Sequence, residues 1–122
     1  MGRSKRKVKI KERDSECLST SSFKTFKDKR KVVHINQYKI LKTLGQGSYG
    51  IVKKVLDTKN NQVYAMKSMM KSFLKKQKIG ASNAYESVKA ELEVLQKLEH
   101  PNIIYLREII DDPTKDDLHI VT

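Results

Sequence analysis

The sequence predicts an α+β fold: a five-stranded antiparallel sheet with one main helix, preceded by a disordered basic arm. Three observations predict it. Short β-branched and aliphatic runs alternate with turn residues from Tyr38 to Met66 and again near the carboxyl end. Apolar residues at helical spacing follow Ala84. Most of the excess positive charge lies in the first third of the chain.

The arm comprises residues 1–36, and the folded part residues 37–122. Residues 1–37 hold twelve Lys and Arg against four Asp and Glu, a balance of +8 within a net charge of +12. A segment rich in Ser and Lys with isolated apolar residues buries too little apolar surface to fold, so we expect disorder there. Deletion of residues 1–34 should accordingly leave the fold intact.

The run MGRSKRKVKIK at the start of the arm is compatible with three roles. It can be a solvated tail, a weak docking site for anionic lipid or nucleic acid, or a nuclear localisation signal. Cys17 is the only cysteine, which favours an intracellular compartment, cytoplasmic or nuclear. No signal peptide or membrane-spanning run is present, and the spacing of the three histidines predicts no metal site.

The first predicted strand, Tyr38–Leu44, leads into glycines 45, 47 and 50, which fit G-x-G-x-x-G. Glycine lets backbone N–H groups approach an anion closely, although ligand-free glycine turns share this pattern. The next run, Ile51–Leu56, is a predicted strand, which excludes a dinucleotide fingerprint because that motif leads into a helix. No Gly-Lys-Ser/Thr follows, which excludes a P-loop.

A turn over residues 57–61 leads to a third strand at Val63–Met66. Period-2 alternation places Val63, Ala65 and Lys67 on one face of this strand. An ammonium group among small apolar residues needs an anion, such as a phosphate or a carboxylate, unless the side chain extends to water. Lys67 is therefore a candidate ligand-binding residue.

Residues 68–83 read as a short helical turn followed by a linker, with Ser82 or Asn83 as the N-cap of the main helix. That helix, Ala84–Leu98, has a buried stripe of Val88, Leu92 and Leu95. Glu91 lies on the same face, whereas Glu93 points away. A carboxylate in an apolar stripe needs a cation, and Lys67 is the available one; the alternative is an ordinary glutamate at the edge of the stripe.

Two further strands are predicted near the carboxyl end. Ile103–Ile110 is strongly apolar, Asp111–Asp116 is a turn, and Leu118–Val121 forms the last strand. These complete the five strands of the expected sheet.

Taken together, these glycines with Val52, Ala65, Lys67 and Glu91 resemble the nucleotide site of eukaryotic protein kinases, and the likeness runs from Tyr38 to the last residue. It implies a kinase-like amino-terminal lobe in which Lys67 holds the α- and β-phosphates of ATP and pairs with Glu91 as the catalytic residues. The implied ATP-binding residues are Leu44, Gly45, Gln46, Gly47, Ser48, Tyr49, Gly50, Val52, Ala65, Lys67 and Thr122.

Segments outside the nucleotide site are similar to calcium/calmodulin-dependent protein kinase kinases. These are NQYK at 36–39, KSFLKKQ at 71–77, EIIDDP at 108–113 and DLHIV at 117–121, and HPNII at 100–104 is kinase-like in general. A short linker stands where those kinases carry an Arg/Pro-rich insert. The resemblance implies a serine/threonine kinase whose protein substrate is itself a kinase, with calmodulin as a candidate partner.

The sequence contains no H-R-D, D-F-G or A-P-E motif. In kinases these supply the catalytic base and the Mg²⁺ ligands, so we expect a truncated kinase domain that is inactive alone, with its Mg²⁺ ligands in a missing carboxy-terminal lobe and no metal site of its own. The alternatives are a non-catalytic lobe acting as a regulatory binding module or nucleotide sensor, and an anionic-surface binder working through the arm.

Overall fold

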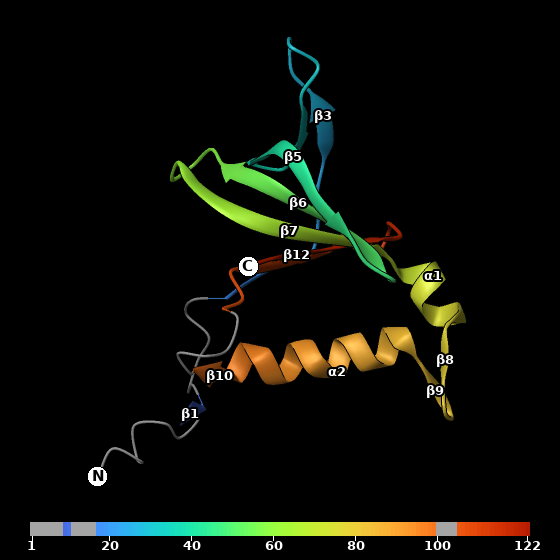
Figure 1. Ribbon diagram of the computed structural model, residues 1–122. Coiled ribbons are helices and arrows are strands. Elements are labelled where there is room, and N and C mark those ends of the chain that lie inside the picture. The colour runs from blue at the N-terminus through green and yellow to red at the C-terminus, as the bar shows by residue number, and fades with distance from the viewer. Residues whose placement is uncertain (1–8, 11–16, 100–104) are drawn as a thin grey trace.

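The computed structural model describes residues 9–10, 17–99 and 105–122. Their main feature is a curled sheet of eight strands in the order β2-β11-β12-β7-β6-β5-β4-β3 (Figure 1). The strands are β2 (Leu18–Thr20), β3 (Thr25–Lys27), β4 (Val33–Ile35), β5 (Tyr38–Gln46), β6 (Gly50–Asp57), β7 (Gln62–Met70), β11 (Glu108–Asp111) and β12 (Asp117–Val121).

Two helices and two short strand pairs complete the described chain. The helices are α1 (Lys71–Lys76) and α2 (Ala84–Lys97). The strand pairs join β1 (Lys9–Ile10) to β10 (Leu98–Glu99) and β8 (Lys78–Ile79) to β9 (Ser82–Asn83). The α2 helix runs beneath the sheet, as Figure 1 shows. No helix in the described ranges is both long enough and apolar enough to cross a membrane.

All five strands predicted from Tyr38 onward form, although the fourth is shorter than predicted, because residues 105–107 lie outside any strand. The structure extends each of the first three by one to several residues, and β12 covers the predicted final strand. Within the predicted run 103–110, β11 begins at Glu108; residues 103–104, like the kinase-like segment 100–104 as a whole, lie outside the described residues. The turn after β6 forms as expected, because Asp57 accepts hydrogen bonds from the backbone N–H groups of Lys59 and Asn61.

The five predicted strands pair antiparallel, as expected. The expected number of strands is wrong, since the structure adds β2, β3 and β4, and β2 pairs parallel to β11. The disordered arm is likewise wrong for residues 17–36. Cys17, Phe23 and Ile35 are all buried, but they lie too far apart in the sequence to produce a periodic pattern. Deletion of residues 1–34 would remove two of these buried side chains, so the fold is not expected to survive it unchanged.

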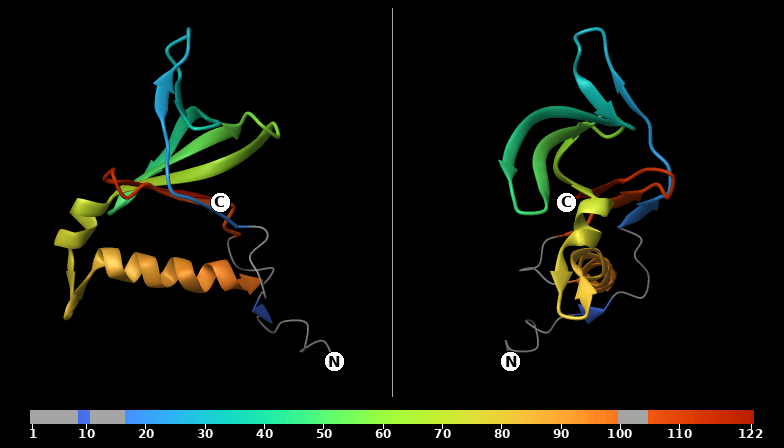
Figure 2. Two further views of the ribbon diagram at one scale, coloured as in Figure 1. Left: turned by 180° about the vertical axis from the view of Figure 1, so that it is seen from behind. Right: turned by 90° about the vertical axis from the view of Figure 1, so that its right-hand side faces the viewer.

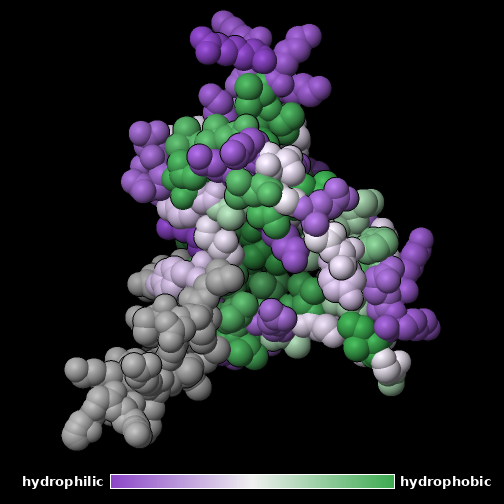
Figure 3. All heavy atoms as spheres, in the orientation of Figure 1, coloured by the Kyte–Doolittle hydropathy of each residue, from purple (hydrophilic) through white to green (hydrophobic). Residues whose placement is uncertain are grey.

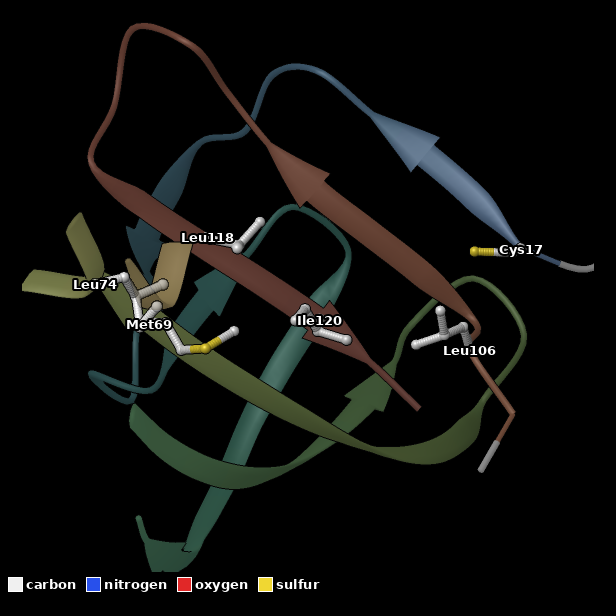
Figure 4. Close-up of a cluster of buried hydrophobic side chains, with 7 residues drawn as sticks. Cys17, Met69, Leu74, Leu106, Leu118 and Ile120 are labelled. Carbon is white, nitrogen blue, oxygen red and sulfur yellow. The ribbon is translucent and has the colours of Figure 1, made fainter. Parts of the chain in front are cut away.

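The sheet has a hydrophobic cluster on each side. The side facing the helices buries Cys17, Met69, Leu74, Ala84, Leu106, Leu118 and Ile120 (Figure 4). The inside of the curl, visible in Figure 2, buries Phe23, Ile35, Tyr38, Val55, Met66, Ile110 and Val121. Adjacent residues of one strand, such as Ile120 and Val121, belong to different clusters because side chains alternate between faces.

A buried carboxylate ties three distant parts of the chain together. Glu108 of β11 accepts hydrogen bonds from the hydroxyl groups of Tyr38 and Thr20. Burial, together with the hydrogen bond and charge of Glu108, raises the pKa of Tyr38 well above its ordinary value, so its hydroxyl stays protonated and donates. These bonds satisfy a group that would otherwise be costly to bury.

Hydrogen bonds also hold the two helices. Asn83 caps α2, as predicted, by accepting a hydrogen bond from the backbone N–H of Glu86 at 2.9 Å. The backbone N–H and hydroxyl of Ser72 both donate to Asp116, which fastens the first turn of α1 to the loop between β11 and β12. Lys71 forms an ion pair with Asp111 at 2.6 Å beside this contact.

The β3–β4 hairpin projects from the sheet and carries a cationic tip (Figures 1 and 3). Asp28 organises the tip by accepting hydrogen bonds from the backbone N–H groups of Arg30 and Val32 and by bonding the His34 ring at 2.9 Å. The His34 bond is the main cause that lowers the pKa of Asp28 to about 2, with the Val32 N–H next. The exposed cations of the hairpin are Lys27, Lys29, Arg30 and Lys31.

Candidate functional site

The glycine-rich segment forms the hairpin between β5 and β6. Gly45 pairs with Val52 and Gln46 with Ile51, and the backbone N–H of Gly47 donates to the carbonyl of Gly50 at 2.8 Å. Ser48 and Tyr49 therefore lie at the tip of the hairpin. The tip is strand-turn-strand, as the sequence predicted, and no helix follows it.

The three glycines of the hairpin differ in what surrounds them. A Cβ on Gly50 would come within 2.3 Å of the Ser68 carbonyl oxygen, so glycine is required there for β6 to approach β7. A Cβ on Gly45 would have no described atom within 4 Å, and one on Gly47 would meet only the Gly50 carbonyl at 3.9 Å. Packing within the described chain thus explains why residue 50 is a glycine. It gives no such reason at positions 45 and 47, which have open space beside them.

Lys67 lies in the middle of β7, with Val52 of β6 and Ile120 of β12 as its cross-strand partners. Two residues earlier on the same strand, Ala65 and Thr122 exchange backbone hydrogen bonds of 2.8 and 3.1 Å. Since side chains two residues apart share a face, Ala65 and Lys67 point to the same side of the sheet, as predicted. Three neighbouring strands thus present small or apolar side chains around one ammonium group.

A cleft of about 480 Å³ separates this face from α2, and Figure 3 shows hydrophobic side chains in the hollow between the sheet and the helix. The cleft brings together six of the site residues predicted from the sequence. They are Tyr49, Val52, Ala65, Lys67, Glu91 and Thr122. The tip residue Tyr49 also packs on the hydrophobic cluster that faces the helices, so its ring folds toward the cleft.

Lys67 and Glu91 line the same cleft but form no ion pair within the described part of the chain. Glu91 is exposed, and Lys67 is partly exposed. Because water reaches both charged groups and screens them, leaving them unpaired costs little free energy. Their pairing therefore stays a prediction.

The remaining predicted nucleotide-binding residues do not line the cleft. Leu44, Gly45, Gln46, Gly47 and Ser48 are exposed in the hairpin, and Gly50 is the close-packed glycine. Several lining residues were not assigned to the site by the sequence analysis, among them Met69, Ile79 and Ser87. Ser87 lies one helical turn before Glu91, so helical spacing was enough to find it. Ile79 comes from the β8–β9 pair, and no sequence pattern indicates that it turns toward the cleft.

These residues fit a nucleotide. Val52 and Ala65 offer an apolar surface to a flat aromatic base, and Lys67 offers a cation to phosphate. The open space beside Gly45 and Gly47 leaves their backbone accessible to an anionic ligand. Among the described residues, no three His, Cys, Asp or Glu side chains are grouped to hold a metal ion.

Residues 38–122 match the protein kinase domain family. The chain is 40% identical over 91 residues to the serine/threonine-protein kinase ssp1 of Schizosaccharomyces pombe, covering 72% of this chain and 14% of that protein. It is 33% identical over 106 residues to a calcium/calmodulin-dependent protein kinase kinase of Caenorhabditis elegans, covering 73% and 20%. It is 40% identical over 88 residues to the serine/threonine-protein kinase GRIK2 of Arabidopsis thaliana, covering 71% of this chain and 22% of that protein.

The chain thus spans between about one seventh and one fifth of the length of these relatives. The matched region includes both the glycine hairpin and the cleft. The resemblance to protein kinases inferred from the motifs is confirmed: this chain belongs to the protein kinase family and contains part of a serine/threonine kinase domain.

Proposed function

We propose that residues 37–122 form the ATP-binding lobe of a serine/threonine kinase that transfers the γ-phosphate of ATP to protein hydroxyl groups. The observation that carries this proposal is the cleft, which Lys67 and Glu91 both line beneath a hairpin whose first two glycines have open space beside them. Lys67 would bind the α- and β-phosphates, and Val52 and Ala65 would pack on the adenine. Bound ATP, with Mg²⁺, supplies the group to be transferred.

A kinase substrate is the more specific proposal. The name of the Caenorhabditis elegans relative, calcium/calmodulin-dependent protein kinase kinase, supports a second kinase as the protein substrate. Calmodulin remains a candidate partner on the same basis. The sequence itself has no H-R-D or D-F-G motif, so this chain alone is expected to bind ATP weakly and to transfer no phosphate.

The test is nucleotide binding by the purified chain, followed as chemical-shift changes during an ATP titration with Mg²⁺. Lys67→Met should weaken binding by about tenfold or more, because a charge-assisted contact to phosphate is lost. Gly47→Ala should also weaken binding while changing the free energy of unfolding by less than about 1 kcal/mol, since its Cβ meets open space.

Gly50→Ala is the matched control in the same hairpin. Its Cβ would collide with the Ser68 carbonyl, so it should cost about 1–3 kcal/mol of stability. In an intact kinase containing this lobe, Lys67→Met and Glu91→Gln should each reduce catalysis, and the double variant should be little worse than the worse single one. ATP affinity that is the same in Lys67→Met, Gly47→Ala and the unmodified chain would show that the cleft is not the phosphate site.

A second activity, weak binding to anionic surfaces, is supported by the β3–β4 hairpin. Its four exposed cations project together from the sheet, and the only acidic side chain among them, Asp28, is engaged by His34 and backbone N–H groups. The cations thus lack a local counter-charge, which favours long-range attraction to an anionic surface. This hairpin lies within the arm for which anionic-surface binding was predicted, and the basic run at the start of that arm remains a second candidate.

A further inference from the structure

The α2 helix packs on the hydrophobic cluster of the sheet through Val88, Leu92 and Leu95, and short strands lie at both of its ends. It starts directly after β9, which pairs with β8, and it is followed by β10, whose partner is β1. Between these ends, one flank of α2 borders the ATP cleft. The other flank borders a smaller pocket of about 300 Å³, to which α2 contributes Leu92 and Gln96 and the β2 region contributes Ser19 and Thr20.

The segment Cys17–Thr20, called the β2 segment below, is fixed firmly to the sheet. It pairs parallel to β11, with Leu18 opposite Glu108 and Thr20 opposite Ile110. The backbone N–H of Leu18 donates to the Arg107 carbonyl at 2.9 Å, and the Thr20 hydroxyl donates to the buried carboxylate of Glu108. Removing the segment would leave that buried carboxylate with one fewer donor, which is costly.

The same segment contacts α2. The amide nitrogen of Gln96 lies 3.4 Å from the Ser19 hydroxyl and 3.7 Å from the Cys17 sulfur. Cys17 is only 7% exposed and belongs to the hydrophobic cluster on which Leu92 and Leu95 of α2 pack. Figure 4 shows Cys17 at the start of β2, near Leu106 on the segment that leads into β11. The β2 segment therefore bridges the sheet and the helix.

We propose that the β2 segment is a positioning element, which sets the rotation and docking of α2 and so controls how closely Glu91 approaches Lys67. Gln96 and Glu91 are five residues apart, which places them about 140° apart around the helix axis. A contact that holds Gln96 on one flank thus fixes the direction of Glu91 on the other. The role of Glu91 as a partner of Lys67 rests on the ATP-binding function proposed above. The role of the β2 segment in joining the sheet to α2 does not depend on that function.

The test compares variants of the full 122-residue chain by hydrogen exchange of the α2 amides. Leu18→Pro removes the N–H that donates to Arg107, and Leu18→Ala keeps it while removing a side chain that is 45% exposed. On the helix side, Gln96→Ala removes the contacts to the β2 segment. Lys97→Ala is its control, because Lys97 is exposed and lines neither pocket.

Exchange of the α2 amides should accelerate about tenfold in Leu18→Pro and about threefold in Gln96→Ala. Amides of β6 and β7 should keep their rates, which reports that the sheet remains folded. Since Cys17 is the only cysteine, its alkylation by N-ethylmaleimide should accelerate in the same two variants. Leu18→Ala and Lys97→Ala should resemble the unmodified chain in both measurements.

The proposal is overturned if Gln96→Ala exchanges its α2 amides no faster than Lys97→Ala, whatever Leu18→Pro does. It is also overturned if Leu18→Pro exposes Cys17 to alkylation while α2 keeps its protection, because the segment would then detach without effect on the helix. ATP affinity of the same variants is measured separately. A chain that binds no ATP yet shows these exchange changes would contradict the proposed function and leave the bridging role standing.

Discussion

Replacing Phe23 by alanine tests whether the residues before Tyr38 belong to the folded core. Phe23 is 5% exposed, and its ring meets His119 edge to face at 4.8 Å between centroids while the Lys115 ammonium lies 4.2 Å from its centre. Phe→Ala changes at such sites cost about 3–5 kcal/mol, through lost burial and the cavity left behind. If the free energy of unfolding of the unmodified 122-residue chain is about 6 kcal/mol or more, the Phe23→Ala variant would still fold.

Urea unfolding of the purified chain, followed by circular dichroism, measures this loss. With a denaturant slope of about 1.5 kcal/mol/M, a loss of about 3 kcal/mol lowers the urea midpoint by about 2 M. Phe26→Ala is the matched control three residues away, because Phe26 is 51% exposed and its ring stacks on that of His34, with 4.5 Å between the centroids. It should cost less than about 1 kcal/mol. Equal, small shifts in both variants would refute the assignment of residues 17–36 to the core.

Two further predictions concern charge. Burial lowers the pKa of His119 to about 4, with a smaller lowering from Lys53, and together they outweigh Asp117, which raises it. Between about pH 6.5 and 4 the folded chain therefore binds fewer protons than the unfolded one. As the pH is lowered through this range, the free energy of unfolding should fall by up to about 1.4 kcal/mol per pH unit. In urea titrations across this range, His119→Gln should lose that part of the slope; an unchanged slope would contradict it. Replacing both Lys29 and Arg30 by Glu should reduce the amount of the chain that sediments with acidic vesicles at low salt. The reduction should be larger than for the same charge reversal at two lysines outside the hairpin, and high salt should abolish the difference. Vesicle binding that persists at high salt would show that the hairpin is not the site that binds anionic surfaces.

Much of the site could be predicted from the sequence because its signals are local. Alternation in β7 placed Ala65 and Lys67 on one face, and helical spacing placed Glu91 on the face of α2 that borders the cleft. The spacing of the glycines predicted the hairpin itself. The missed lining residue Ile79 shows the limit, since a two-residue strand has no period from which its direction can be read.

The sequence by itself determined the order of strands from Tyr38 onward, the extent of α2 and the chemical character of the cleft, because each depends on residues a few positions apart. Only the tertiary structure decided the role of residues 17–36, because Cys17 is buried in a cluster with Leu106, and Phe23 and Ile35 are buried in a cluster with Val121, all far along the chain. The distance between Lys67 and Glu91 was decided in the same way. It depends on the position of α2, which packs on a cluster that includes Cys17 and Leu106, and no pattern within the helix encodes that packing.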